Sequence, residues 1–210
     1  MIKSPKPAFE KIEPGFGSSF AYRTYDENHE NNSHNFWHYH PELELVYVKG
    51  GTGKRQVGSH ISYYRNGELI LIGSNLPHCG FTDSLNNYER ETVIQMHPDF
   101  LGPEFFSIPE MRGIKALFER AKMGIVFHGE LKRSVGSKIE AIKEASNYNR
   151  LLVLLEILKE LEAADKYTVL NAQGFILETE LQDNNRINII FNFVKEEFKR
   201  QITLEEISEL

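Results

Sequence analysis

Two histidines and a glutamate are closely spaced in the segment FWHYHPELELVYVKGG, residues 36–51. His38 and His40 lie two residues apart, and Glu44 follows four residues after His40. In an extended strand these three side chains share one face. Imidazole and carboxylate groups bind Zn, Fe, Mn or Ni, and they also hydrogen-bond polar small molecules. The segment is therefore compatible with a metal site, with the wall of a small-molecule pocket, or with the packing of one strand.

The opposite face of this predicted strand is apolar. It carries Trp37, Tyr39, Leu43, Leu45 and Tyr47, which are expected to pack. Two imidazoles and a carboxylate are costly to bury without partners. We therefore expect either a hydrated site or a site that a ligand or metal satisfies.

Composition narrows the class of protein. The chain has 210 residues, of which 40% are hydrophobic and 26% charged, as in a soluble globular protein. The net charge of −6 argues against nucleic-acid binding by this chain alone. A single cysteine, Cys79, excludes an internal disulfide and is typical of the cytoplasm. No apolar run reaches the roughly 18 residues of a membrane span, so we expect no membrane partner.

The first half of the chain predicts β-structure. Short runs rich in Val, Ile, Leu and Tyr are separated by Gly and Asn turn signals: Leu43–Val48, His60–Tyr64, Glu68–Ile72 and Thr92–Met96. This spacing favours a sandwich or barrel. Asn66-Gly67 is the dipeptide of a tight type I′ hairpin turn, which needs two positive φ angles.

The second half, from about Pro109, has helical periodicity. In Asn149–Ala164 the apolar residues recur with 3-4-3 spacing, at Leu151, Leu154, Leu158 and Leu161. Two arrangements fit this seam. The helix lies on the barrel wall, or it pairs with a second subunit.

The C-terminal residues predict a linker and further helices. LQDNNR ends a weak segment, Ile187–Phe198 has one apolar face, and Thr203 with Glu206 forms a capping box. The helix that this box opens reaches Leu210 with its apolar pattern unfinished. Because so short a helix is unstable by itself, we expect the chain to be part of a longer one.

Two motifs resemble those of the cupin superfamily. The spacing His38-x-His40-x3-Glu44-x6-Gly51 is similar to the first cupin motif, and GELILIGSNLPHCG (67–80) to the second. In metal-binding cupins three histidines and the glutamate hold the metal, which implies the set His38, His40, Glu44 and His78. The departures from the usual cupin residues are Asn32 for Gly, Gly73 for Pro, Asn75 for Gly and Thr82 for Asn.

The chain resembles the N-terminal sensor and dimerisation domain of AraC-family transcriptional regulators. The resemblance lies in the segment WHYHPELELVYVKGG, in the following segment NGELILIGSNLPH, and in the order of the later helices. The resemblance covers nearly the whole chain. It implies a mainly β then α fold, in which a cupin-like β-barrel (jelly roll) precedes a helical dimerisation and linker segment. The implied parts are an N-terminal arm (1–20), the barrel (21–108), a helical dimerisation segment (109–182), and a linker with the start of an incomplete helix-turn-helix DNA-binding domain (183–210).

The resemblance also implies a function. We expect the effector-sensing and dimerisation portion of a cytoplasmic regulator, with no enzyme activity. A small polar molecule such as a sugar would contact His38, His40, Glu44 and His78 in the barrel. The chain would form a homodimer through Leu151, Leu154, Leu158 and Leu161, and would reach DNA through the C-terminal domain that is missing here. The alternative is a metal-dependent cupin enzyme, of the dioxygenase or sugar isomerase type, with Zn, Fe, Mn or Ni on the same four residues.

Overall fold

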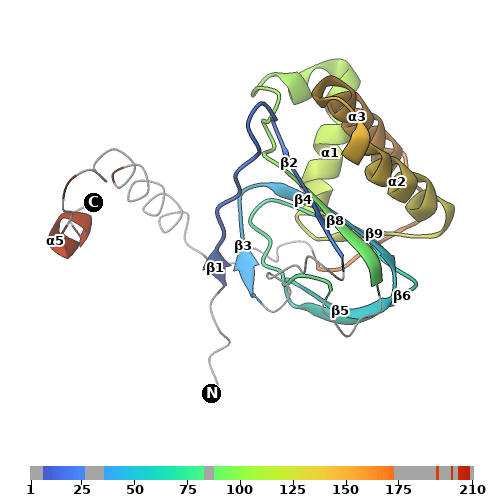
Figure 1. Ribbon diagram of the computed structural model, residues 1–210, viewed down its shortest axis with the longest axis horizontal. Coiled ribbons are helices and arrows are strands. Elements are labelled where there is room, and N and C mark those ends of the chain that lie inside the picture. Colours follow the sequence, from blue (N-terminus) through green and yellow to red (C-terminus); the bar gives the residue numbers. More distant parts are fainter. Residues whose placement is uncertain are drawn as a thin grey trace. The chain divides into compact units, whose positions relative to one another are not determined.

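The computed structural model describes residues 7–26, 36–82, 88–172, 193, 200 and 203–208. The chain divides into two units, Met1–Phe175 and Ile176–Leu210. The first unit is a β-sandwich with three α-helices on one side (Figure 1). This is the predicted mainly β then α fold.

The larger sheet of the first unit has six strands in the order β10-β9-β7-β4-β8-β2, all paired antiparallel. Its strands are β2 (Ala21–Tyr25), β4 (Leu43–Gly50), β7 (Glu68–Ile72), β8 (Tyr88–Met96), β9 (Ile125–Phe127) and β10 (Tyr167–Val169). In this register Glu44 lies between Ile72 on β7 and Gln95 on β8. The four strands predicted from the sequence are all present, some of them longer than expected.

The second layer is smaller. In it β1 (Ala8–Phe9) runs parallel to β3 (His38–Tyr39), and β5 (Thr52–Val57) pairs antiparallel with β6 (His60–Arg65). His78 joins the two pairs, because its backbone bridges to His38 on one side and to Val57 on the other. Two of the predicted site histidines are therefore neighbours across this layer.

Alternation along the strands creates two separate cores. Residues of one face fill the space between the two sheets, including Val46, Val48, Ile70 and Ile72. Residues of the other face pack against the helices, including Leu43, Leu45, Leu69 and Leu71. This confirms the prediction that Leu43 and Leu45 lie opposite the face of Glu44.

The helices α1 (Arg112–Ala121), α2 (Gly129–Ala141) and α3 (Asn147–Glu162) cover the outer face of the larger sheet (Figure 1). Short 3₁₀ turns precede α1 at Phe105–Ser107 and Pro109–Met111, and one follows α2 at Ile142–Glu144. The N-terminus of α3 is capped by the Ser146 hydroxyl, which accepts from the Asn149 amide.

The apolar seam of α3 is internal. Leu154, Leu158 and Leu161 are fully buried within the chain, while Leu151 is partly exposed. Side chains without exposed surface cannot meet a second subunit. The seam therefore packs on the barrel side, and a partner would contact α3 through other side chains, such as Tyr148 and Leu152, which are 70% and 41% exposed.

Asn66 and Gly67 have the predicted positive φ angles of 57° and 76°. The hairpin prediction is nevertheless wrong, because β6 pairs with β5 whereas β7 pairs with β4 and β9. The turn instead carries the chain from one sheet to the other. A Cβ at position 67 would lie 2.2 Å from the Val48 carbonyl oxygen, so the close approach also requires glycine.

Five strands of the described residues were not predicted: β1, β2, β5, β9 and β10. β9 and β10 are three residues each and lie in the half with helical periodicity, and β1 has two residues in the N-terminal arm. Strands as short as these three carry too few residues for alternation to be recognised.

In the second unit, α5 (Leu204–Ser208) begins with the predicted capping box. The Thr203 amide donates to Glu206 Oε2 at 2.9 Å, and the Glu206 amide donates to Thr203 Oγ1 at 3.2 Å. The predicted linker and, apart from Phe193, the predicted helix Ile187–Phe198 lie outside the described residues. Across the described part of the chain, no helix combines the length and the apolar character needed to cross a membrane.

Candidate functional site

The four predicted site residues come together at one end of the sandwich interior. The segment that carries three of them is not one strand: β3 ends at Tyr39, the chain bends at Pro41 and Glu42, and β4 begins at Leu43. This bend moves the chain between layers, so that His38 and Glu44 face each other across the interior. One ligand atom from each of His38, His40, Glu44 and His78 lies within 4.8 Å of the others.

Backbone carbonyls orient all three histidines in the same way. The Nδ1 atoms of His38, His40 and His78 lie 2.8, 3.1 and 2.9 Å from the carbonyl oxygens of residues 36, 42 and 76, respectively. A carbonyl oxygen only accepts hydrogen bonds, so each Nδ1 carries the hydrogen. In its neutral form each imidazole therefore presents the lone pair of Nε2 to its other neighbours.

These Nε2 atoms meet carboxylates. His40 Nε2 lies 3.1 Å from Glu44 Oε2, and His78 Nε2 lies 3.4 Å from Glu44 Oε1. His78 Nε2 is buried and has no hydrogen-bond partner in the part of the chain that the structure describes. Lone pairs facing a carboxylate repel one another unless a cation lies between them.

Burial sets the electrostatics of the cluster. Burial and the neighbouring His78 lower the pKa of His38 to about 4. For His40, burial opposes the charged form, but the hydrogen bond and charge of Glu44 outweigh it and raise the pKa. Burial likewise opposes the charge of Glu44, yet His78 and the His40 hydrogen bond hold the pKa of that carboxyl well below its usual value. Glu44 is therefore ionised, and positive charge nearby stabilises it.

A divalent cation fits these residues. Adjacent ligands bound at about 2.1 Å to one ion, at right angles, are separated by roughly 3.0 Å. The Nε2–carboxylate distances of 3.1 and 3.4 Å are close to this value. The Nδ1–carbonyl hydrogen bonds are also the usual supporting contacts of metal-bound histidines. His38, His40, Glu44 and His78 would hold the ion, which would present open positions to a polar ligand.

Two residues that sequence reasoning missed support Glu44. The Gln95 amide on β8 donates to Glu44 Oε2 at 2.7 Å, and Arg23 on β2 donates to the Gln95 carbonyl oxygen. Neither residue belongs to a motif, because the sheet register brings Gln95 to Glu44 from 51 positions away, and Arg23 to Gln95 from 72 positions away. No local sequence signal could have found them.

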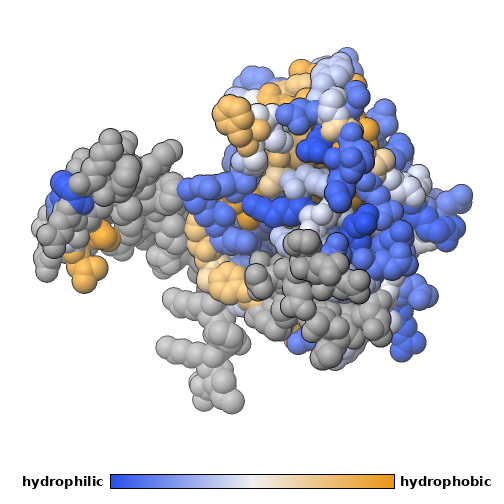
Figure 2. All heavy atoms as spheres, in the orientation of Figure 1, coloured by the Kyte–Doolittle hydropathy of each residue, from blue (hydrophilic) through white to orange (hydrophobic). Residues whose placement is uncertain are grey.

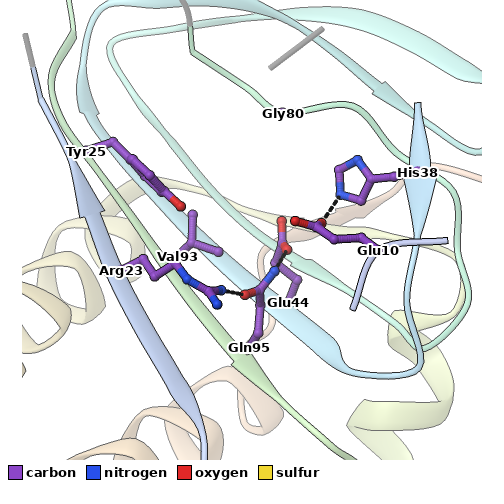
Figure 3. Close-up of a pocket in the computed structure, with 8 residues that line it drawn as sticks. All are labelled: Glu10, Arg23, Tyr25, His38, Glu44, Gly80, Val93 and Gln95. Carbon is purple, nitrogen blue, oxygen red and sulfur yellow. Dashed lines mark hydrogen bonds and ion pairs between the residues drawn. The ribbon is translucent and has the colours of Figure 1, made fainter. Parts of the chain in front are cut away.

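A cavity of about 170 Å³ adjoins the cluster (Figure 3). The carboxylates of Glu10 and Glu44 point into it, and the phenol of Tyr25 and the guanidinium of Arg23 border it. Its lining is otherwise completed by His38, Gly80, Val93 and Gln95. The lining is predominantly polar, so the cavity suits a polar molecule or ion better than an apolar one.

A comparison with known protein families identifies the family of this chain. The model of the AraC-like ligand binding domain matches residues 20–160. The chain belongs to this family. This AraC-like domain is therefore an effector-sensing domain of a transcriptional regulator, as the sequence resemblance implied.

The AraC-like chain is also similar to solved structures of ToxT from Vibrio cholerae. ToxT of strain O395 bound to (E)-4-(8-methylnaphthalen-1-yl)but-3-enoic acid is 14% identical, with 90% of this chain and 70% of that chain covered and a TM-score of 0.44. Wild-type ToxT of strain SCE256 bound to an unsaturated fatty acid is 10% identical, with coverage of 93% and 69% and a TM-score of 0.39. No curated protein matches the sequence.

Proposed function

We propose that this sensor domain binds a small polar effector in the cavity, next to a divalent cation held by His38, His40, Glu44 and His78. The observation that carries the proposal is the shared orientation of the three imidazoles. Each Nδ1 is fixed by a carbonyl, and the Nε2 atoms of His40 and His78 converge on the Glu44 carboxylate. A cation of the Zn, Fe, Mn or Ni type would balance these groups.

The size and lining of the cavity support a small polar effector. About 170 Å³ lies below the roughly 300 Å³ at which drug-sized pockets begin, so few ligand atoms fit beside an ion. Carboxylate, guanidinium, amide and phenol groups offer both donors and acceptors, as a sugar or another polyol requires. The ion would supply a Lewis acid for an effector oxygen.

Membership of a regulator family favours sensing over turnover, and we propose that the domain is not an enzyme. We further propose a cytoplasmic homodimer that reaches DNA through a C-terminal helix-turn-helix domain, of which the capped helix α5 would be the beginning. The exposed apolar residues of α3, Tyr148 and Leu152, support a dimer surface there. In the view of Figure 2, hydrophobic patches lie among mostly hydrophilic surface, both over the helical part of the first unit and near β1.

Calorimetric titration of the EDTA-treated chain with Zn²⁺, Mn²⁺ and Ni²⁺ tests the cation site. We expect one ion per chain in the unmodified protein, and loss of binding in His78→Ala because an unpartnered ligand is removed. His97→Ala is the matched control, since His97 is an exposed histidine outside the cluster. Equal binding by His78→Ala and the control would refute the site.

Effector binding is tested on the ion-loaded chain. Trp37, the only tryptophan, precedes His38, so its fluorescence provides a signal close to the site. We expect sugars, polyols or small organic acids to change this signal and raise the melting temperature, with Arg23→Ala weakening the response. A response only to apolar molecules would contradict a polar effector.

A further inference from the structure

The N-terminal arm brings a second carboxylate to the cluster. The Ala8 amide donates to the Trp37 carbonyl at 2.9 Å, and the Glu10 amide donates to the Tyr39 carbonyl at 3.0 Å. This parallel register lays Glu10 over His38. Its Oε2 atom lies 3.1 Å from His38 Nε2 (Figure 3).

In the contact between Glu10 and His38, neither a carboxylate oxygen nor the Nε2 atom of a neutral His38 carries a hydrogen to donate. His38 Nδ1 uses its hydrogen on the Phe36 carbonyl, 2.8 Å away. In the neutral imidazole the other nitrogen carries no hydrogen, so Nε2 of the buried His38 faces Glu10 with a lone pair. Two sources of positive charge would make the contact favourable: a hydrogen on the Glu10 carboxyl, or a cation bound by both groups.

The distance between Glu10 and His38 fits a cation bound by both groups. The separation of 3.1 Å between Glu10 Oε2 and His38 Nε2 equals that between His40 Nε2 and Glu44 Oε2 inside the cluster. Both are close to the roughly 3.0 Å expected for adjacent ligands of one ion. The carboxylates of Glu10 and Glu44 also line the same cavity, and a cation between them would offset the repulsion of two negative groups.

We propose that Glu10 is a fifth protein ligand of the cation, so that cation binding fastens strand β1 of the N-terminal arm onto the barrel. The inference rests on the proposed cation site. It adds a residue outside both cupin-like motifs, and it makes the position of the arm depend on the state of the site.

Other contacts also hold the arm, among them the hydrogen bond from Arg23 Nη2 to the Glu13 carbonyl. Besides the two backbone hydrogen bonds, Phe9 packs edge-on against Tyr39 with ring centroids 5.7 Å apart, and Ile12 is buried. Hydrogen bonds of this kind each contribute only modestly to stability. A ligand bond from Glu10 would therefore strengthen the docking of β1. Because coupling is reciprocal, loss of the ion loosens the arm and loss of Glu10 weakens the ion.

Glu10→Gln separates the two explanations of the contact. The amide is a poor metal ligand, but it donates a hydrogen bond to His38 Nε2 and so preserves a purely structural contact. Glu13→Gln is the matched control, because it removes the same charge from the same arm at a side chain that is 71% exposed. Circular dichroism verifies that both variants fold.

Two readouts are taken on the full chain with Zn²⁺ as the probe: affinity by calorimetry, and amide hydrogen exchange of residues 7–12 with and without the ion. We expect Glu10→Gln to weaken Zn²⁺ binding on the order of 10-fold or more, and Glu13→Gln to leave it unchanged. Zn²⁺ should slow exchange of the arm in the unmodified chain and in Glu13→Gln, but not in Glu10→Gln.

Each other outcome is decisive. If Glu10→Gln binds Zn²⁺ with unchanged affinity, and Zn²⁺ does not alter amide exchange of the arm, Glu10 is a structural hydrogen-bond partner. This result would overturn the inference, but it would be consistent with the four-residue site. Weaker affinity without any effect of Zn²⁺ on the arm overturns the fastening of β1. Absence of Zn²⁺ binding in the unmodified chain overturns both the cation site and the role of Glu10.

Discussion

The two faces of the larger sheet differ in what they bury. On the outer face, Leu43 and Leu45 pack against the helices in an apolar core. On the inner face, the residue between them, Glu44, joins three buried histidines. One strand therefore serves packing on one side and chemistry on the other.

The difference has an energetic meaning. Each fully buried leucine on the outer face stabilises the fold by about 1.5–3 kcal/mol. Each buried polar group that lacks a partner on the inner face costs about 1–3 kcal/mol. The outer face thus stabilises the domain, whereas the inner face holds a buried atom, His78 Nε2, that has no hydrogen-bond partner among the described residues. The following predictions test this division, from the largest effect to the smallest.

Leu158→Ala tests the outer face. Leu158 on α3 is fully buried, so the substitution should lower the free energy of unfolding by about 2–5 kcal/mol through lost contacts and a cavity. Urea denaturation of the metal-free chain measures the change. The affinity of the folded variant for Zn²⁺ should stay unchanged, and a comparable loss of affinity would contradict the separation of the two faces.

Zn²⁺ tests the inner face. At a free concentration 100 times its dissociation constant, an ion that binds only the folded chain should raise the free energy of unfolding by about 2.7 kcal/mol. His40→Ala should show no such gain, because it removes a ligand and the partner of Glu44. Urea denaturation with Zn²⁺ and with EDTA gives the difference, and equal stabilisation of both proteins would place the ion elsewhere.

Gln95→Leu tests how the sheet register supports the site. The substitution keeps an apolar body on β8 but removes the donor to Glu44 Oε2. Loss of such a supporting contact should weaken Zn²⁺ binding roughly 10-fold. Calorimetry compares it with Gln56→Leu, a control at a half-buried glutamine on β5. Unchanged affinity would mean that Glu44 needs no support from β8.

Leu152→Lys should have the smallest effect on folding. Leu152 is 41% exposed, so its replacement should change the free energy of unfolding by less than about 0.5 kcal/mol. We expect light scattering to show fewer dimers, because a charge would enter the proposed dimer surface. An unaltered dimer would exclude this side of α3 from the interface.

Sequence patterns predicted the parts of the fold that repeat over enough residues. Short runs rich in Val, Ile, Leu and Tyr between turn signals identified β4, β6, β7 and β8, and the local spacing His-x-His-x3-Glu identified three residues of the cluster. The bend at Pro41 was not needed for that prediction, because the motif fixes the residues whether or not they share one strand.

The remainder depends on contacts between distant segments. Glu10 and Gln95 reach the cluster through strand register, and no pattern near either residue marks them. The seam of α3 shows the same limit, because its spacing fitted both internal and intersubunit packing and only the burial of Leu154, Leu158 and Leu161 distinguished them. Periodicity shows that a face is apolar, but not what covers it.

X-ray absorption spectroscopy at the zinc edge of the Zn²⁺-loaded chain tests the central claim most directly, because it reports the atoms bound to the ion. We predict nitrogen and oxygen ligands at about 2.0–2.2 Å, with the scattering pattern of three imidazoles. A sulfur ligand at about 2.3 Å, which would come from Cys79, or fewer than three imidazoles would contradict a site built from His38, His40, Glu44 and His78.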